Sequence, residues 1–385
     1  MMNKFTFHPV GQGLFYSGQL DCDNWDYRRY SRYNFIFDCG SLSGQEVLYP
    51  AIDKYLTDLN KRCVNLCVIS HLDKDHYNGL YYLIRNKHIC IDKILLPYLP
   101  DNNMLRFVVL VGQFYSATEQ FNDNDYSNLR HILGLYGIGD IRYDVTPIIL
   151  NRENLTDNYK SGEYQCLKYE IEDDILKYYW QIECYNKTLC ENKWQELTKR
   201  VLSLLRENNF ANITDMLNFN PESIARIAKI YGEVFKNKNV TSIVMKHHPL
   251  YDGVGLYPNC CCELPYRLTY YERKYFDREI DLFGRKNANI SVLTGDMEFD
   301  ESLRQIVFGN YNGINVLQIP HHGSYKNFES VKLPDYFESK SIISFGLGNR
   351  FGHPNKRTIE KLKCIKYNDM IFVHQNASYE YYIMK

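Results

Sequence analysis

Short apolar runs alternate with a helix-like segment in the first hundred residues. Residues 34–40 and 64–70 are apolar runs typical of buried strands, the first ended by Gly40 and the second by polar residues. Between them, residues 45–60 carry apolar side chains at helical spacing, which predicts a helix with one buried face. This alternation of strand and helix favours an α/β fold.

The pattern changes after residue 100, where helical spacing becomes dominant. Helices are predicted at residues 104–121, 126–136, 194–208 and 221–235. Residues 164–185 alternate between apolar and polar positions, as a β-hairpin does.

Strand-like runs resume near residue 241. They are predicted at residues 241–246, 290–294, 314–319, 341–345 and 370–374. We therefore predict an α/β domain in two halves, residues 1–100 and 238–385, with a mostly helical insertion at residues 101–237.

The composition excludes some classes of protein. Lys+Arg 45 against Asp+Glu 46 gives a net charge of -1, which excludes a generally basic nucleic-acid coat but leaves a local phosphate site open. No apolar run reaches the roughly 18 residues of a spanning helix, and the first residues lack a signal peptide's apolar core. We therefore expect a cytoplasmic protein without membrane association. Its 12 cysteines are then expected to be reduced thiols, with Cys39 and Cys67 in core strands.

The strongest chemical signal directly follows the apolar run at 64–70. The sequence HLDKDH places His71, Asp73, Asp75 and His76 within six residues, with Lys74 among them. A strand-to-loop turn can direct these side chains into one pocket, and imidazole with carboxylate suits Zn, Mn or Fe. The alternative is a polar loop that caps the helix after it.

Three later strand ends carry similar residues. Asp296 lies in LTGDME, His321 and His322 lie in IPHHGS, and His353 lies in FGHP. Each motif is weak alone, because strand-end histidines often cap or pack. Four such strand ends in one chain predict a metal site, with Asp296 placed to bridge two ions.

In this order, the motifs HLDKDH, LTGDME, IPHHGS and FGHP resemble the metallo-β-lactamase superfamily. The closest resemblance is to the soluble hydrolase domain of the ComEC type, found at the C-terminus of competence DNA-uptake channels. It covers residues 5–100 and 238–385 and implies a metallo-β-lactamase-like αββα sandwich around the helical insertion. Transport is not implied, because the chain has no spanning segment.

The resemblance also implies two divalent metal ions, Zn or Mn, and a ligand set for them. The expected ligands are His71 and Asp73 for one ion, Asp75 and His76 for the other, Asp296 as the bridge, and His321 or His322 to complete the second site.

Three details of this ligand set distinguish the chain. We favour His321 for the second site, because it directly follows the strand. Asp73 replaces the superfamily's usual histidine, as in the ComEC type, and makes the first site richer in oxygen. No counterpart of the superfamily's third histidine precedes the strand at 241–246.

Two such ions would clamp the attacking and leaving oxygens and generate hydroxide near neutral pH. Asp75 would orient or deprotonate the water, and Ser324 with the amides of the Gly323 turn would hold a phosphate oxygen. His353 would neutralise phosphate charge or protonate the leaving group, unless it is only a turn residue fixed by Pro354. Lys74 would reach the substrate or remain solvated.

The HHGS and GHP resemblances predict a dinuclear metal-dependent phosphodiesterase, a nuclease that cleaves DNA or RNA. Residues 266–278 mix basic and aromatic side chains, as a single-strand-binding surface does, but a tyrosine-rich strand and helix would look the same. One alternative is a phosphodiesterase for small cyclic or linear nucleotides. Another is a non-catalytic binding module with a degenerate metal site, in which the insertion at 101–237 would bind a protein partner.

Overall fold

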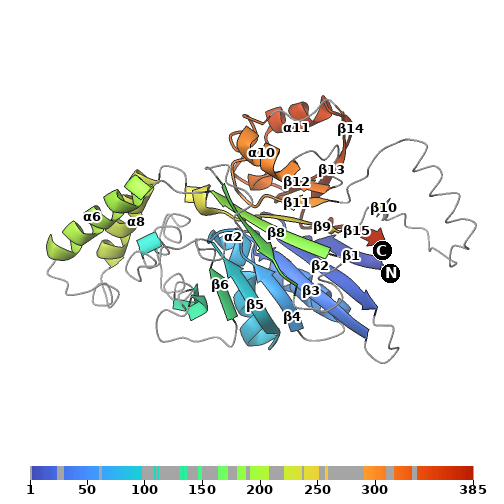
Figure 1. Ribbon diagram of the computed structural model, residues 1–385, viewed down its shortest axis with the longest axis horizontal. Coiled ribbons are helices and arrows are strands. Elements are labelled where there is room, and N and C mark those ends of the chain that lie inside the picture. Colours follow the sequence, from blue (N-terminus) through green and yellow to red (C-terminus); the bar gives the residue numbers. More distant parts are fainter. Residues whose placement is uncertain are drawn as a thin grey trace, which may run out of the picture.

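The computed structural model describes residues 2–23, 30–59, 63–97, 108–109, 111, 130–132, 134–136, 146–149, 164–171, 180–187, 191–207, 221–235, 238–250, 256–258, 290–308, 316–331 and 336–384. These residues form two mixed β-sheets packed face to face, with helices on their outer sides (Figure 1). The chain is therefore an α/β sandwich, in agreement with the predicted fold class.

The first sheet has eight strands in the order β10-β15-β1-β2-β3-β4-β5-β6. Their bounds are β10 Leu256–Pro258, β15 Tyr379–Met384, β1 Met2–Phe7, β2 Phe15–Asp23, β3 Tyr30–Cys39, β4 Cys63–Val68, β5 Cys90–Leu96 and β6 Thr146–Ile149. Strands β3 to β6 are parallel, whereas β15, β1 and β2 pair antiparallel.

The second sheet has seven strands in the order β14-β13-β12-β11-β9-β8-β7. Their bounds are β14 Lys366–Val373, β13 Tyr336–Ser344, β12 Val316–Gln318, β11 Ser291–Leu293, β9 Val244–Pro249, β8 Trp180–Lys187 and β7 Tyr164–Tyr169. Strands β11 to β14 are parallel, and β7, β8 and β9 are antiparallel.

The central core fills the space between the two sheets. Phe35 and Phe37 of β3 point into it from the first sheet, whereas Ile36 belongs to the cluster on the opposite face. In the second sheet, Ile342 of β13 points into the central core and Ile343 points away from it. This two-residue alternation, with both faces buried, explains why the central strands are nearly continuous apolar runs.

Helices cover the outer face of each sheet. On the first sheet, α1 (Gln45–Asp58) buries Leu48, Ile52 and Tyr55 at helical spacing. It is followed along the chain by α2 (Lys74–Tyr77), α3 (Gly79–Tyr81) and a π-helical turn, η1 (Tyr82–Asn86). On the second sheet, Leu303 of α10 (Glu301–Phe308) and Leu362 of α11 (Lys356–Lys363) pack on the outer core.

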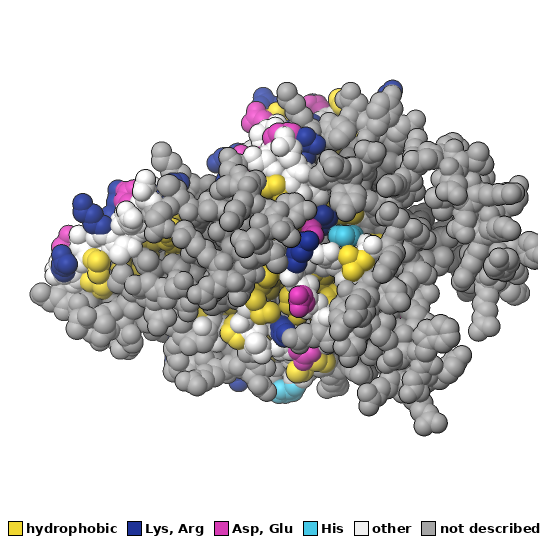
Figure 2. Space-filling view, viewed as in Figure 1, with side chains coloured by type: hydrophobic (Ala, Val, Ile, Leu, Met, Phe, Trp, Pro, Cys, Tyr) yellow, Lys and Arg dark blue, Asp and Glu magenta, His cyan; other side chains and the backbone are white. Residues whose placement is uncertain are grey.

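Helices α6 (Glu191–Glu207) and α8 (Pro221–Val234) lie side by side at one end of the sandwich (Figure 1). Arg200 of α6 and Glu233 of α8 form an ion pair at 2.8 Å. Figure 2 shows Lys and Arg side chains interspersed with Asp and Glu over these two helices, so this described surface has mixed charge.

The parallel strands of the two sheets end at a common edge. Two hydrogen bonds join the sheets there, from the Ile243 amide to the Ser70 carbonyl at 2.8 Å and from Ser344 Oγ to the Gly13 carbonyl at 2.7 Å. Short 3-10 turns at η4 (Lys238–Thr241) and η5 (His321–Gly323) flank this edge. Ligands in open α/β folds bind at such carboxyl ends, so a binding site is expected at this edge.

Most of the strands and helices predicted outside the middle segment are present. The middle segment itself is less separate than predicted, because its strand β6 extends the first sheet and its hairpin β7–β8 extends the second. The predicted hairpin and the helices at 194–208 and 221–235 are confirmed, but the strands of residues 101–237 belong to the two sheets. Most of the helices predicted at 104–121 and 126–136 lies outside the described residues, as does the segment 266–278.

Two further predictions concern the compartment. Cys39 and Cys67 are fully buried in β3 and β4, and the described cysteines are free thiols. Among the described residues, no helix combines the length and the apolar character needed to cross a membrane.

Candidate metal centre

Four strand ends bring acidic and histidine side chains together at the common edge. Asp38 lies at the end of β3 and His71 follows β4, both in the first sheet. Asp296 follows β11, and His321 and His322 follow β12, in the second sheet. Groups as far apart as 247 positions in the sequence thereby reach hydrogen-bonding distance.

Asp296 lies at the middle of this group and is buried. Its Oδ2 atom is 3.5 Å from Nε2 of His71 and 3.5 Å from Nε2 of His321. Its Oδ1 atom is 3.3 Å from Nε2 of His76. The two oxygens of one carboxylate therefore face different histidines, which is the arrangement that a bridging ligand needs.

The groups around Asp296 form two sets. On the Oδ2 side, Nε2 of His71 is also 3.6 Å from Oδ2 of Asp73. On the Oδ1 side, Asp75, His76 and His322 have ligand atoms that all lie within 4.8 Å of one another. His71, His76 and Asp296 meet the same distance criterion and join the two sets.

The two adjacent histidines of IPHHGS belong to different sets, and His322, rather than the favoured His321, lies in the set with Asp75 and His76. His322 takes that place, because its Nε2 is 3.1 Å from Oδ2 of Asp75. His321 and His322 have φ values of 48° and 53°, in the left-handed region that ordinary residues rarely adopt. This tight turn after β12 directs His321 to Asp296 and His322 to Asp75.

His321 occupies the side of Asp296 where a further histidine was expected from a position before the strand at 241–246. No histidine was found ahead of the strand at 241–246 to join His71 and Asp73. In the structure His321 lies with them on the Oδ2 side of Asp296. The IPHHGS turn thus supplies one imidazole to each set.

All four histidines direct the same ring nitrogen to the centre. In each, Nδ1 is paired with an oxygen: Ser70 Oγ at 2.9 Å for His71, Asp38 Oδ2 at 2.7 Å for His76, Asn327 Oδ1 at 3.1 Å for His321 and the Ser344 carbonyl at 2.8 Å for His322. When Nδ1 carries the proton, Nε2 keeps its lone pair. Metal-binding histidines are oriented in this way by a second layer of acceptors.

Asp38 contacts a candidate ligand, His76, and was not singled out by the sequence analysis. It is fully buried and accepts hydrogen bonds from the Ser70 amide and Ser70 Oγ, each at 2.6 Å, in addition to His76 Nδ1. The signal was present, because an aspartate directly before Cys39-Gly40 ends a buried strand as the other site motifs do. Its φ of 56° turns the backbone sharply at that point.

The Asp296 turn is held by the side chain of Gln318 in β12. Its Oε1 atom accepts hydrogen bonds from the amides of Thr294 and Gly295, at 2.7 and 2.8 Å. Gly295 has a φ of 53°, and a Cβ atom there would lie 2.8 Å from Ser70. Glycine is therefore required for the close approach that places Asp296 next to His71.

The electrostatics of the centre pair carboxylates with imidazoles. Burial would raise the pKa of Asp296, but His321, His76 and His71 hold it well below its usual range. Burial would lower the pKa of His71, but Asp296 and Asp73 raise it to about 9. Asp296 is thus ionised, and protons on His71 and His76 balance its charge. A divalent cation that binds here displaces those protons.

The donor set fits divalent cations. Among the described residues, the buried atoms His71 Nε2, His76 Nε2 and Asp296 Oδ1 have no hydrogen-bond partner, and an unpaired buried polar atom is costly. Imidazole nitrogen and carboxylate oxygen are ligands for Zn and Mn. The buried His/Asp groups of this edge can therefore hold metal ions.

The predicted substrate-contacting residues lie around the two histidines. The ring of His353 is 5.3 Å from that of His321, and burial together with His321 and His322 lowers its pKa to about 4. The Gly323 amide donates to the Pro320 carbonyl and the Ser324 amide to the His321 carbonyl. These two amides thus donate hydrogen bonds within the turn.

Two other predicted substrate contacts, Ser324 and Lys74, lie next to candidate ligands in the sequence. Ser324 is buried directly after the η5 turn. Lys74 is half-buried at the start of α2, between Asp73 and Asp75.

No protein-family model matches this chain, and a search of curated proteins finds no match either. The assignment of function therefore rests on the geometry above and on the four motifs.

Proposed function

We propose that this protein is a dinuclear metal-dependent phosphodiesterase of the metallo-β-lactamase superfamily that cleaves nucleic acid. The observation that carries the proposal is the position of Asp296, whose two carboxylate oxygens face two different sets of histidines at 3.3–3.5 Å. A single carboxylate between two ligand sets is suited to hold a pair of cations. The sandwich with outer helices and the order of the motifs are compatible with the superfamily fold.

Each cation would have a complete set of protein ligands. His71, Asp73 and His321 would hold one ion, and Asp75, His76 and His322 the other, with Asp296 shared. Asp38, Asp73, Asp75 and Asp296 carry four formal negative charges, which two divalent cations balance. Zn and Mn both fit these nitrogen and oxygen donors.

Two divalent ions in one site supply an activated water nucleophile and stabilise the leaving oxygen of a phosphodiester. The protein's own residues do the rest. Oδ2 of Asp75 lies 3.1 Å from Nε2 of His322, so the carboxylate that would orient the water lies beside the imidazole that would share its ion. Asp73 is partly exposed, so in this proposal substrate would reach the centre from its side.

His353 acts through a neutral ring in this proposal. With a pKa near 4 it carries no charge at pH 7, so its part is to donate a hydrogen bond from its N–H to a phosphate oxygen. That role differs from both expectations from the sequence, neutralisation of phosphate charge and protonation of the leaving group. Asn349 holds the His353 backbone by accepting from its amide at 3.2 Å and donating to its carbonyl at 2.6 Å.

The test is hydrolysis of bis(p-nitrophenyl) phosphate with Mn²⁺ or Zn²⁺. We expect metal-dependent turnover in the wild type and a loss of at least about 100-fold in Asp75→Asn and Asp296→Asn, because each removes a charged ligand. His88→Asn is the matched control, since His88 is an exposed histidine that belongs to neither ligand set. Folding of all variants is checked by circular dichroism.

Substrate class is then decided with single-stranded DNA, RNA and dinucleotides. Cleavage of polymers supports the nuclease. Turnover of dinucleotides alone would favour the small-nucleotide phosphodiesterase, which the net charge of -1 also permits. Folded wild-type protein without any turnover would favour the binding module.

A further inference from the structure

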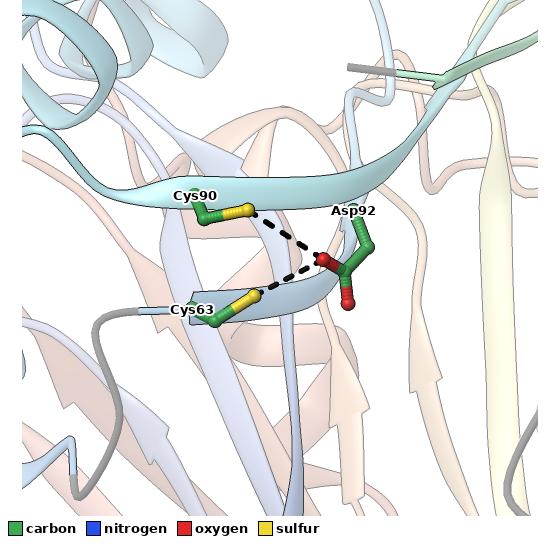
Figure 3. Close-up of side chains that lie close together, drawn as sticks. All are labelled: Cys63, Cys90 and Asp92. Atoms are coloured by element: carbon green, nitrogen blue, oxygen red, sulfur yellow. Dashed lines mark hydrogen bonds between the residues drawn. The ribbon is translucent and has the colours of Figure 1, made fainter. Parts of the chain in front are cut away.

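A second cluster of metal-binding side chains lies at the amino-terminal ends of β4 and β5 (Figure 3). Cys63 begins β4 and Cys90 begins β5, and the two residues are direct partners in the parallel pair. Asp92 is two residues after Cys90, on the same face of β5. Its Oδ1 atom is 3.1 Å from Sγ of Cys63 and 3.6 Å from Sγ of Cys90.

We propose that Cys63, Cys90 and Asp92 form a separate metal site that binds a thiophilic divalent cation, Zn²⁺ above all. Their ligand atoms lie within 4.8 Å of one another. Two thiolates and one carboxylate match the sulfur and oxygen donors that Zn²⁺ accepts in tetrahedral sites. Cys90 and Asp92 are exposed and Cys63 is half-buried, so the cation enters from solvent and water takes the fourth position.

Neighbouring strands hold the carboxylate in place. Asn65, two residues after Cys63, donates from Nδ2 to Asp92 Oδ2 at 2.9 Å, which leaves Oδ1 directed at the thiols. The Asn65 amide is itself oriented, because its Oδ1 accepts from the Asn34 amide of β3 at 2.9 Å. This chain of contacts across three strands resembles the supporting layer of built metal sites.

The site is distinct from the His/Asp centre. The Cys63 end of β4 and the His71 end of the same strand are separated by the strand's six residues, or about 16 Å at the usual rise per residue. The His/Asp centre has no sulfur ligand among the described residues. The two sites therefore differ in their donor atoms, and the inference is independent of the proposed function.

A disulfide between Cys63 and Cys90 is the competing use of this pair. A disulfide requires no third group, whereas Asp92 faces both sulfurs and is oriented by Asn65. A carboxylate in that position is a ligand in a metal site and has no part in a disulfide. We therefore assign the cluster to metal binding.

Cobalt titration of the full-length chain tests the site, because thiolate-to-Co²⁺ charge transfer absorbs in the near ultraviolet and a His/carboxylate centre lacks it. We expect this band in the wild type. The double variant Cys63→Ser, Cys90→Ser should lose the band and should bind one equivalent of Co²⁺ fewer than the wild type. Cys364→Ser, an exposed cysteine outside the cluster, should keep both. Circular dichroism confirms that each variant is folded.

Asp92→Asn separates metal binding from thiol chemistry, because it keeps both cysteines. We expect it to weaken Co²⁺ binding by more than about tenfold, the usual scale for even a supporting group. The proposal is overturned by a wild type without the band, by a band that persists in the double variant, or by unchanged affinity in Asp92→Asn. A Cys63–Cys90 disulfide that forms while equimolar Zn²⁺ is present also overturns it.

Discussion

The Nδ1 nitrogen of His76 donates a hydrogen bond to Oδ2 of Asp38 at 2.7 Å, and both side chains are fully buried. This contact fixes the imidazole so that Nε2, 3.3 Å from Oδ1 of Asp296, presents its lone pair to the centre. A carboxylate behind a histidine ligand sets the tautomer and increases the basicity of the ligand. Asp38 thus determines what His76 can bind.

Asp38→Asn should weaken the binding of Mn²⁺ by about 10- to 100-fold, because the amide can present a donor to His76 and no longer selects the required tautomer. Isothermal titration with Mn²⁺ measures the change. Asp58→Asn is the control, since Asp58 is an exposed carboxylate that pairs with Lys4. Equal affinity for Mn²⁺ in Asp38→Asn and wild type would show that Asp38 does not support metal binding.

His321→Gln and His322→Gln should each lower the number of tightly bound Mn²⁺ ions from two to one, because the two histidines belong to different sets. Metal analysis after gel filtration gives the count. Retention of both ions by either variant would show that the histidine in question is not a ligand. If one variant lost both ions, the two sets would not be independent.

The sequence predicted the local parts of this centre better than the parts that depend on backbone conformation or on long-range contacts. The motif at residues 71–76 is local, so one strand-to-loop turn predicted its clustering correctly. His321 and His322 face different sets because both have left-handed φ values. Neither residue is a glycine, so the sequence pattern did not predict this conformation. Asp38 was missed because an apolar run predicts a strand and is silent on the contacts of its last polar residue.

The fold shows the same division. Buried strands such as β3 and β4 and the helix α1 follow from local spacing, and they were predicted close to their observed bounds. Sheet membership follows from long-range pairing. The antiparallel pairing of β1 with β15, from Met2 with Met384 onward, and the extension of both sheets by residues 146–187 leave no local signal.

Gln318→Met should lower the free energy of unfolding by about 2 kcal/mol, because it leaves the buried amides of Thr294 and Gly295 without their acceptor. Urea denaturation measures the difference. Gln305→Met on the exposed side of α10 serves as the control and should change stability by less than about 0.5 kcal/mol. Similar effects of the two substitutions would contradict the role of Gln318.

His247 should make the protein sensitive to acid. It is fully buried, its Nε2 is 2.7 Å from the Tyr16 hydroxyl, and burial lowers its pKa from 6.5 to about 3. Between these values the unfolded chain binds a proton that the folded protein does not, so stability falls as pH falls from 6.5 towards 3. The contribution is about 1.4 kcal/mol per pH unit.

Urea denaturation of wild type and His247→Gln across this pH window measures that contribution. Glutamine keeps a polar partner for Tyr16 but does not titrate, so the stability of the variant should depend less steeply on pH. Parallel pH profiles for the two proteins would show that His247 is not the group responsible.

The central claim is that a pair of ions shared by Asp296 hydrolyses phosphodiesters. The most direct test is to titrate metal-free protein with Mn²⁺ and to follow the hydrolysis of bis(p-nitrophenyl) phosphate. The Cys63→Ser, Cys90→Ser variant is used so that only the His/Asp centre is filled. We predict that the activity of this variant rises until two equivalents of Mn²⁺ are bound and then levels off. The same protein with Asp296→Asn should show no activity at any metal concentration. Activity that levels off at one equivalent, or that is absent in folded protein with two ions bound, would contradict it.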